Sequence, residues 1–196
     1  MKILITGAGG FLGRNFIAET LQATEYELIA ATSQREGLWK QWGDGNGRLT
    51  VIENSALVEV DWKSVNILLN CAFPRNVDEE QMVAGLKFIS DTILAATNGD
   101  VGAVINISSQ SVYSQERLEP ATEHTSLSLD SKYAIGKYVT ELLINTMCAK
   151  IPHTNIRLAS LIGPEFNQRI TNKFIDEAIA GNNLKLIGGR QRFGFL

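Results

Sequence analysis

The first thirteen residues constrain the fold of this chain more than any other stretch. Lys2 to Thr6 form a short apolar run of β-prone residues, and glycines follow at every third position, at Gly7, Gly10 and Gly13. A helical pattern begins at Phe11. The first glycine permits a sharp turn, the second lets backbone N–H groups approach a diphosphate, and the third lets helix and strand pack closely. The pattern predicts a nucleotide-binding turn, although glycines at a strand end can also form an ordinary turn.

Composition excludes several classes of partner. The chain has 196 residues, 44% of them hydrophobic, which is enough for one domain with a buried core and a fragment of another. Its net charge of −3 provides no electrostatic attraction for nucleic acid or anionic membranes. Cys71 and Cys148 are far apart and lack metal-ligand spacing, and no apolar run approaches the length of a membrane span. We therefore expect a cytoplasmic protein with free thiols and no bound metal.

Strand and helix patterns alternate along the chain. Strands are predicted at 2–6, 27–31, 49–52, 66–72, 101–107 and 154–159, with a seventh starting at 184, and helices at 11–24, 79–97, 131–150 and 169–180. Asp130 is the predicted cap of the third of these helices. Alternation of this kind favours a doubly wound α/β fold with a seven-stranded, mostly parallel sheet. In such a sheet the ligand lies where the strand order reverses, here between the ends of the first and fourth strands.

The end of the second strand bears on which dinucleotide is bound. Thr32, Ser33 and Arg35 stand where an acidic residue would bind the adenosine ribose of NAD, and no acid is present there. Ser33 and Arg35 can bind and neutralise a 2′-phosphate, which favours NADP over NAD, although an arginine in such a loop can also serve solubility alone. Asn54, after the third strand, is placed to meet the adenine edge.

Three residues form a candidate catalytic set. Tyr133 and Lys137 are four apart on a predicted helix and so project from one face. A nearby ammonium and an oxidised nicotinamide both favour the phenolate, so the pair can act as a general acid and base near neutral pH. Ser109 ends the fifth strand, at the same sheet edge as the glycine turn, where its hydroxyl can hold a substrate alcohol or carbonyl.

These motifs together resemble those of the extended short-chain dehydrogenase/reductases, especially the NAD-dependent epimerase/dehydratase group that acts on nucleotide sugars. The resemblance extends over the chain in five stretches, Thr6 to Gly13, Ser108 to Tyr113, Tyr133 to Lys137 with Glu141 beyond, Arg157 to Pro164, and Gly188 to Arg192. It implies a Rossmann-like dinucleotide domain at 1–165 and the start of a truncated substrate-binding region at 166–196. A homodimer formed through the helices after the fourth and fifth strands is common in this family.

The resemblance also implies roles for individual residues. Tyr133 is the expected catalytic acid and base, Lys137 its partner and a ligand of the nicotinamide ribose, and Ser109 the hydroxyl on the substrate side. The residues expected along the cofactor are Gly7, Gly10, Phe11, Leu12, Gly13, Thr32, Ser33, Arg35, Asn54, Ser55, Cys71, Ala72, Phe73, Ser108, Lys137 and Leu158. Ser160 and Arg192 are expected at the substrate, Arg192 at its diphosphate.

Departures from the family pattern narrow the expected activity. Dehydratases of this group carry an acidic pair after the catalytic Ser or Thr, whereas Gln110 and Ser111 follow Ser109 here. Ser160 replaces an asparagine that contacts nucleotide sugars. We therefore expect an NAD(P)-dependent epimerase or reductase that transfers hydride at a carbinol or keto carbon of a nucleotide-linked sugar. The alternatives are an NADPH-dependent reductase of a non-sugar carbonyl and a non-catalytic dinucleotide-binding subunit.

Overall fold

The computed structural model describes residues 1–74, 78–114, 116–164, 166 and 170–184. The chain divides into two compact units, Met1–Arg157 and Leu158–Leu196. The first unit contains the glycine turn and all three predicted catalytic residues. Each unit is described by itself below.

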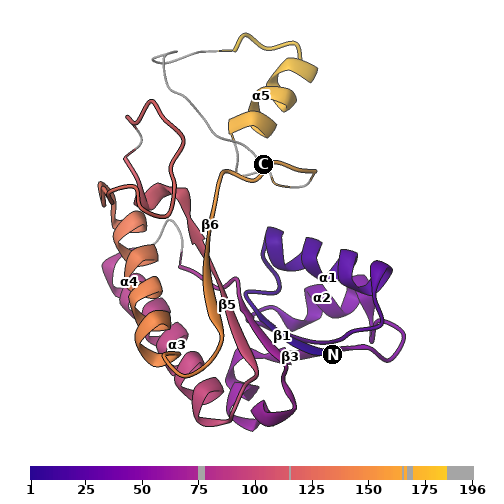
Figure 1. Ribbon diagram of the computed structural model, residues 1–196. Coiled ribbons are helices and arrows are strands. Elements are labelled where there is room, and N and C mark those ends of the chain that lie inside the picture. The colour runs from indigo at the N-terminus through magenta and orange to yellow at the C-terminus, as the bar shows by residue number, and fades with distance from the viewer. Residues whose placement is uncertain (75–77, 115, 165, 167–169, 185–196) are drawn as a thin grey trace. The chain divides into compact units, whose positions relative to one another are not determined.

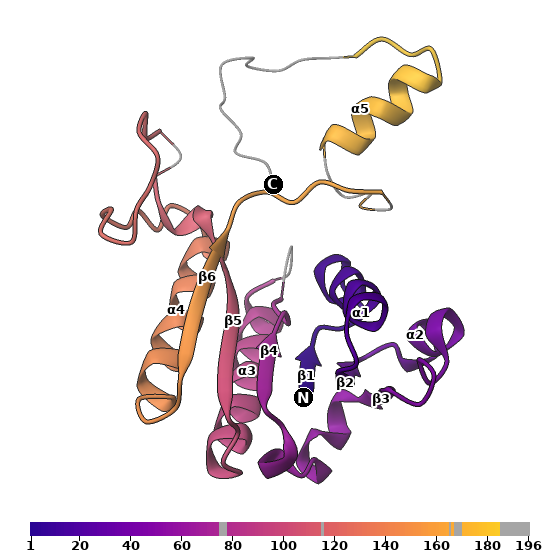
Figure 2. The same cartoon turned by 45° about the vertical axis from the view of Figure 1, so that its right-hand side comes forward.

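A six-stranded sheet organises the fold (Figure 1), and its strand order, β3-β2-β1-β4-β5-β6, can be followed in Figure 2. The strands are β1 (Lys2–Thr6), β2 (Glu27–Thr32), β3 (Leu49–Glu53), β4 (Ile67–Asn70), β5 (Ala103–Ser109) and β6 (His153–Leu158). The β1/β2, β1/β4, β2/β3 and β4/β5 pairs are parallel. The predicted doubly wound α/β class is confirmed, and the order reverses between β1 and β4 as expected. Most of the predicted seventh strand, from Leu184 onward, lies outside the described residues.

Helices cover both faces of this sheet (Figure 2). The helices of the first unit are α1 (Phe11–Ala23), α2 (Arg35–Trp42), α3 (Glu79–Asn98) and α4 (Lys132–Met147), with short 3₁₀ helices at η1 (Asn54–Glu59), η2 (Trp62–Ser64) and η3 (Gln110–Val112). One core cluster contains Ile3 and Ile5 with Ile17 of α1, and the other contains Leu4 with Ile93 of α3. The alternation of Ile3, Leu4 and Ile5 between the two clusters places α1 and α2 against one face and α3 and α4 against the other.

Three local expectations were wrong. Asp130 does not cap α4, because its carboxylate accepts from the Ser128 hydroxyl while the Ser131 hydroxyl accepts from the Ala134 N–H. The fifth strand begins two residues later than expected and continues to Ser109. The helix α2 was not predicted, because its apolar residues are few. Leu38 is buried there, whereas Trp39 is 48% exposed.

The second unit contains α5 (Ile170–Ile179). Gly181 follows this helix with a φ of +73°, and the N–H of Asn182 donates to the carbonyl of Glu177 at 2.9 Å. A left-handed glycine just beyond the last turn is the usual way to satisfy the final carbonyls. The predicted end of this helix at Gly181 is confirmed.

A ladder of polar side chains runs across the sheet toward α4. Thr6 Oγ1 donates to Asn70 Oδ1 at 2.7 Å, and Asn70 Nδ2 donates to Asn106 Oδ1 at 2.8 Å. Asn106 then donates to Asn155 at 2.8 Å, and Asn155 donates to Asn145 of α4 at 2.9 Å. Thr6, Asn70 and Asn106 are also register partners in the sheet, so the ladder fixes the alignment of β1, β4 and β5 near their carboxyl ends.

We expect the Asn106→Leu variant to lower the free energy of unfolding by about 2–4 kcal/mol in urea denaturation, because it leaves Nδ2 of the buried Asn70 and Oδ1 of the half-buried Asn155 without their hydrogen-bond partner. Asn106 is 0% exposed and bonds to Asn70 and Asn155. The control is Asn145→Ala at the exposed end of the ladder, where water can replace the lost bond. Equal stability losses in the two variants would contradict this account.

Candidate functional site

The glycine turn brings the ends of β1 and β4 into close contact. Gly7 has a φ of +64°, and a Cβ there would lie 2.7 Å from the backbone nitrogen of Ala72. A Cβ on Gly13 would lie 2.7 Å from both Ala8 Cα and the Gly7 carbonyl oxygen. Only glycine satisfies both the backbone angle at Gly7 and the close packing at Gly13. The turn therefore has the geometry that the sequence predicted for the first and third glycines.

The first turn of α1 is suited to an anion. Across α1 itself, which is fully described, no side chain caps the N-terminus and no acid lies in the first turn. In α3 and α4, by contrast, Asp78 and Ser131 cap the corresponding ends. The positive end of the α1 dipole thus has no side-chain counter-charge of its own, and a diphosphate could supply it.

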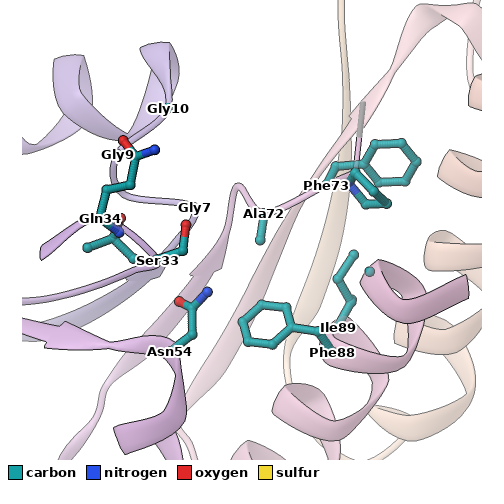
Figure 3. Close-up of a pocket in the computed structure, with 13 residues that line it drawn as sticks. Gly7, Gly9, Gly10, Ser33, Gln34, Asn54, Ala72, Phe73, Phe88 and Ile89 are labelled. Atoms are coloured by element: carbon teal, nitrogen blue, oxygen red, sulfur yellow. Dashed lines mark hydrogen bonds between the residues drawn. The ribbon is translucent and has the colours of Figure 1, made fainter. Parts of the chain in front are cut away.

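A cavity of about 420 Å³ opens at this turn (Figure 3). Its lining comes from the glycine turn and the ends of β2, β3 and β4, together with the N-terminal half of α3. The residues are Gly7, Gly9, Gly10, Thr32, Ser33, Gln34, Asn54, Ala72, Phe73, Pro74, Gly85, Phe88 and Ile89. A long groove with glycines at one end and apolar side chains at the other matches a dinucleotide, which carries both phosphates and flat rings.

Asn54 carries an unsatisfied acceptor in this cavity. Its Oδ1 atom is buried and has no hydrogen-bond partner among the described residues. Its carboxamide lies across the cavity from the Phe88 ring (Figure 3). A buried acceptor without a partner costs free energy, and a ligand amino group would remove that cost. An adenine ring against Phe88, with its amino group toward Asn54, therefore fits the residues present.

The end of β2 carries no carboxylate. Thr32 is buried and its Oγ1 accepts from the Gln34 N–H at 3.1 Å. Ser33 and Gln34 line the cavity. Arg35 is exposed as the first residue of α2 and is not among the lining residues.

Tyr133 and Lys137 come together on one face of α4. The Lys137 ammonium is buried and donates to the Ile107 carbonyl of β5 at 2.7 Å, and it lies 6.0 Å from the centre of the Tyr133 ring. The Phe73 ring lies beside both residues. The predicted phenol and ammonium are therefore adjacent, at the end of β5 that carries Ser109.

Ser109 is held at the start of η3. Its side chain is largely buried, its hydroxyl donates to Ser111 Oγ at 3.1 Å, and it accepts from the Ser111 N–H at 3.1 Å. The bond from the Ser111 N–H fixes the position of the Ser109 oxygen, and rotation of the hydroxyl away from Ser111 would let it donate to a substrate oxygen.

A buried carboxylate ties the catalytic elements together. Glu141 of α4 is 3% exposed and accepts from Arg157 Nε at 2.9 Å and from Arg157 NH2 at 2.6 Å. It also accepts from the Ser108 hydroxyl. Arg157 donates in turn to the Tyr113 hydroxyl at 2.6 Å, and its bonds to Glu141 raise the pKa of the guanidinium. One side chain thus links α4, β5 and β6.

The Cys71 thiol lies close enough to Lys137 for the ammonium charge to affect its pKa. Burial raises the pKa of the Cys71 thiol to about 12, and the Lys137 ammonium offsets only part of that rise. The thiol is therefore neutral at physiological pH, and the positive charge of Lys137 is not cancelled by a thiolate.

Other predicted site residues lie elsewhere. Phe11, Leu12, Ser55 and Cys71 do not line the cavity, and the Ser108 hydroxyl is directed to Glu141. Leu158 and Ser160 belong to the second unit, and Arg192 lies outside the described residues. The roles of all these residues stay predictions.

Sequence reasoning missed the contribution of α3 to the cavity. Phe88, Ile89 and Gln34 line the cavity, but none of them was among the predicted cofactor-binding residues. One residue in the sequence could have indicated that α3 lies close to the end of β4. Gly85 stands inside a helix, where glycine is unfavourable, and it accommodates the Pro74 ring that follows β4.

Together, the glycine turn at the strand-order reversal and the Tyr133–Lys137 pair define a Rossmann-like nucleotide-binding domain with a candidate acid–base site. The NAD dependent epimerase/dehydratase family matches residues 3–196. The chain belongs to this family.

Relatives come from archaea and bacteria. The low-salt glycan biosynthesis protein Agl12 of Haloferax volcanii is 25% identical over 206 residues, which cover 96% of this chain and 66% of that protein. The UDP-glucuronic acid 4-epimerase of Bacillus cereus, in complex with NAD, has a TM-score of 0.81 at 20% identity, with 96% and 66% of the two chains covered. DesIV, a dTDP-glucose 4,6-dehydratase of Streptomyces venezuelae, has a TM-score of 0.79 at 21% identity, with 96% and 65% covered. The chain thus spans just under two thirds of these relatives' lengths.

None of the described helices is long and apolar enough to cross a membrane. Within the same residues, no group of three or more His, Cys, Asp or Glu side chains could hold a metal ion.

We expect Glu141→Gln to lower the free energy of unfolding by about 2–4 kcal/mol, because it leaves the Arg157 guanidinium without its buried counter-charge. The lower part of the range reflects the partial exposure of Arg157, whose side chain is 22% exposed. The matched control is Glu79→Gln, which breaks the exposed Lys132–Glu79 pair. Chemical denaturation should show the control unchanged, and a similar small effect in both variants would contradict the linking role of Glu141.

Proposed function

We propose that this protein transfers hydride between a nicotinamide dinucleotide and a carbinol or keto carbon of a nucleotide-linked sugar, as an epimerase or a reductase. The observation that carries the proposal is the Lys137 ammonium held between the Ile107 carbonyl and the Tyr133 ring, next to the cavity at the glycine turn. An ammonium buried beside a phenol serves acid–base chemistry, and a purely dinucleotide-binding subunit would not need one.

The chain's own residues would hold the dinucleotide along the cavity. The N–H groups in the first turn of α1 would meet the diphosphate, and Asn54 would accept from the adenine amino group. Lys137 would bind the nicotinamide ribose. When bound, the nicotinamide ring supplies the two-electron acceptor or donor for the reaction.

Proton transfer is assigned to Tyr133. The phenolate would take the proton of the substrate hydroxyl as the adjacent C–H bond breaks, and the phenol would return it when the carbonyl is reduced. Lys137 favours the phenolate by its charge, and the Ser109 hydroxyl would donate to the substrate oxygen, so that the substrate's own hydroxyl proton goes to Tyr133. An epimerase would reduce the transient ketone on its opposite face, whereas a reductase would release the alcohol.

The relatives support a nucleotide-linked sugar as substrate. The Bacillus cereus protein is a UDP-glucuronic acid 4-epimerase crystallised with NAD, and another structural relative, MoeE5, was crystallised with UDP-glucose and NAD. Gln110 and Ser111 after Ser109 supply no carboxylate for the elimination of water, which supports epimerase or reductase chemistry over dehydration.

The end of β2 favours a second candidate, an NADPH-dependent reductase of a non-sugar carbonyl. Ser33 and Gln34 line the cavity and Arg35 follows them, and none of these three residues carries a carboxylate that would repel a 2′-phosphate. Cofactor retained by the purified protein distinguishes an epimerase from a reductase of either substrate. NAD(H) released by heat denaturation supports the epimerase, whereas a protein that binds and exchanges NADPH supports the reductase.

We expect Tyr133→Phe to lower turnover of UDP-glucuronic acid or UDP-glucose by at least about a hundredfold, since the phenylalanine ring cannot exchange a proton. Affinity for the dinucleotide, measured by fluorescence titration, should stay close to that of the parent. Tyr138→Phe, one position beyond Lys137 on the same helix, is the control. Equal turnover in the Tyr133→Phe variant and the parent would refute the mechanism.

We also expect Arg35→Ala to weaken NADPH binding more than NADH binding, because only NADPH carries the 2′-phosphate that the guanidinium would neutralise. Lys40→Ala removes a charge from the last turn of the same helix and serves as control. Parallel losses of affinity for the two dinucleotides would show that Arg35 does not read the 2′-phosphate.

A further inference from the structure

Phe73 contacts both members of the candidate acid–base pair. Its ring centre lies 4.2 Å from Lys137 Nζ and 5.2 Å from the centre of the Tyr133 ring, with the two rings at 83° to each other. The first contact is a close cation–π geometry and the second is an edge-to-face aromatic pair. One ring at the end of β4 thus touches the phenol and the ammonium together.

The ring has a defined seat against α4. A Cβ on Gly136 would lie 3.0 Å from Phe73 Cζ and 3.2 Å from Met82 Sδ, so the helix presents bare backbone to the ring at this point. Gly136 lies between Tyr133 and Lys137 in the sequence. A larger residue there would push the ring away from both. The Phe73 ring therefore packs against the same turn of α4 that carries Tyr133 and Lys137.

A lysine side chain needs such a support. Its ammonium ends a flexible stem of four methylene groups, and a buried position is populated only when fixed contacts offset the loss of hydration. The Ile107 carbonyl holds Lys137 from β5 at 2.7 Å, and the face of Phe73 approaches it from β4. Contacts from two strands confine the ammonium better than a single carbonyl could.

We propose that Phe73 is a positioning residue, whose aromatic face holds the Lys137 ammonium beside Tyr133 and in the orientation that binds the dinucleotide. The inference rests on the proposed function for the role of Lys137, and it adds a residue that acts through Lys137. Phe73 also lines the cavity, so a direct contact with the dinucleotide is the competing explanation.

A double-mutant cycle separates the two explanations. The variants are Phe73→Leu, Lys137→Met and the double variant, and the measurement is the dissociation constant for NADH and NADPH by fluorescence titration. We expect Phe73→Leu to raise that constant about three- to tenfold in the parent, the range of a partly desolvated cation–π contact, and to change it little when Lys137 is already methionine. The same loss in both backgrounds would overturn the proposal in favour of direct contact.

The electronic character of the ring gives a second test at nearly constant shape. Pentafluorophenylalanine at position 73 keeps the packing against Gly136 but reverses the charge distribution of the ring face. We expect it to weaken binding as much as Phe73→Leu does, whereas an effect of packing alone would leave affinity at the parent value. Phe16→Leu, which removes a half-buried ring from α1, controls for a general loss of stability.

An NMR measurement without any ligand tests the contact between Phe73 and Lys137 directly. It can therefore fail or succeed independently of the proposed function. In protein labelled with ¹³C at the lysine ε carbon, Lys137 is assigned by the signal lost in Lys137→Arg. Its ε protons should resonate upfield in the parent and in Phe16→Leu, because they lie near the ring face, and should move downfield in Phe73→Leu. If the parent binds neither NADH nor NADPH, the proposed function fails while this measurement still tests the contact. An unmoved Lys137 signal would overturn the positioning role itself.

Discussion

The arrangement of the site depends on the hydrogen bonds and the ion pair that the buried Glu141 carboxylate makes with Arg157 and Ser108. This carboxylate is buried on α4, one turn beyond Lys137, and it holds β6 through Arg157 and β5 through Ser108. An uncompensated charge at this depth would be costly, so helix and strands must meet where the hydrogen bonds are complete. The positions of Lys137 on the helix and of Ser109 on the strand are thereby set by a single charged group that touches neither.

The ladder of polar side chains from Thr6 to Asn106 likewise uses hydrogen bonds to align β1, β4 and β5. The side chains on the α3 and α4 face are apolar at Leu4, Leu68 and Val104, and become polar one step nearer the carboxyl ends, at Thr6, Asn70 and Asn106. Apolar packing has little directional preference, whereas amide pairs require a defined register. The strand ends that carry the glycine turn and Ser109 are therefore aligned by hydrogen bonds rather than by packing alone.

Much of this organisation could be predicted from the sequence because its signals are local. The turn at Gly7 follows from glycine spacing, and the meeting of Tyr133 with Lys137 follows from helical periodicity. Contacts between distant segments could not be predicted in the same way. Asp130 and Ser131 are both good caps, and only the bond between Asp130 and Ser128 decides which one is used. The placement of Phe73 against α4 depends on Gly136, which looks like an ordinary helix glycine until the tertiary structure is known.

The neutral thiol of Cys71 has a chemical consequence for the site. With a pKa of about 12, only roughly one thiol in 10⁵ is ionised at neutral pH, and the thiolate is the form that oxidants and electrophiles attack. A cysteine beside a buried lysine would ordinarily be a candidate for modification. Here the low dielectric around Cys71 outweighs the attraction of the ammonium. Cys71 therefore stays a neutral thiol beside Lys137 at neutral pH, and a neutral thiol is a poor nucleophile toward oxidants and electrophiles.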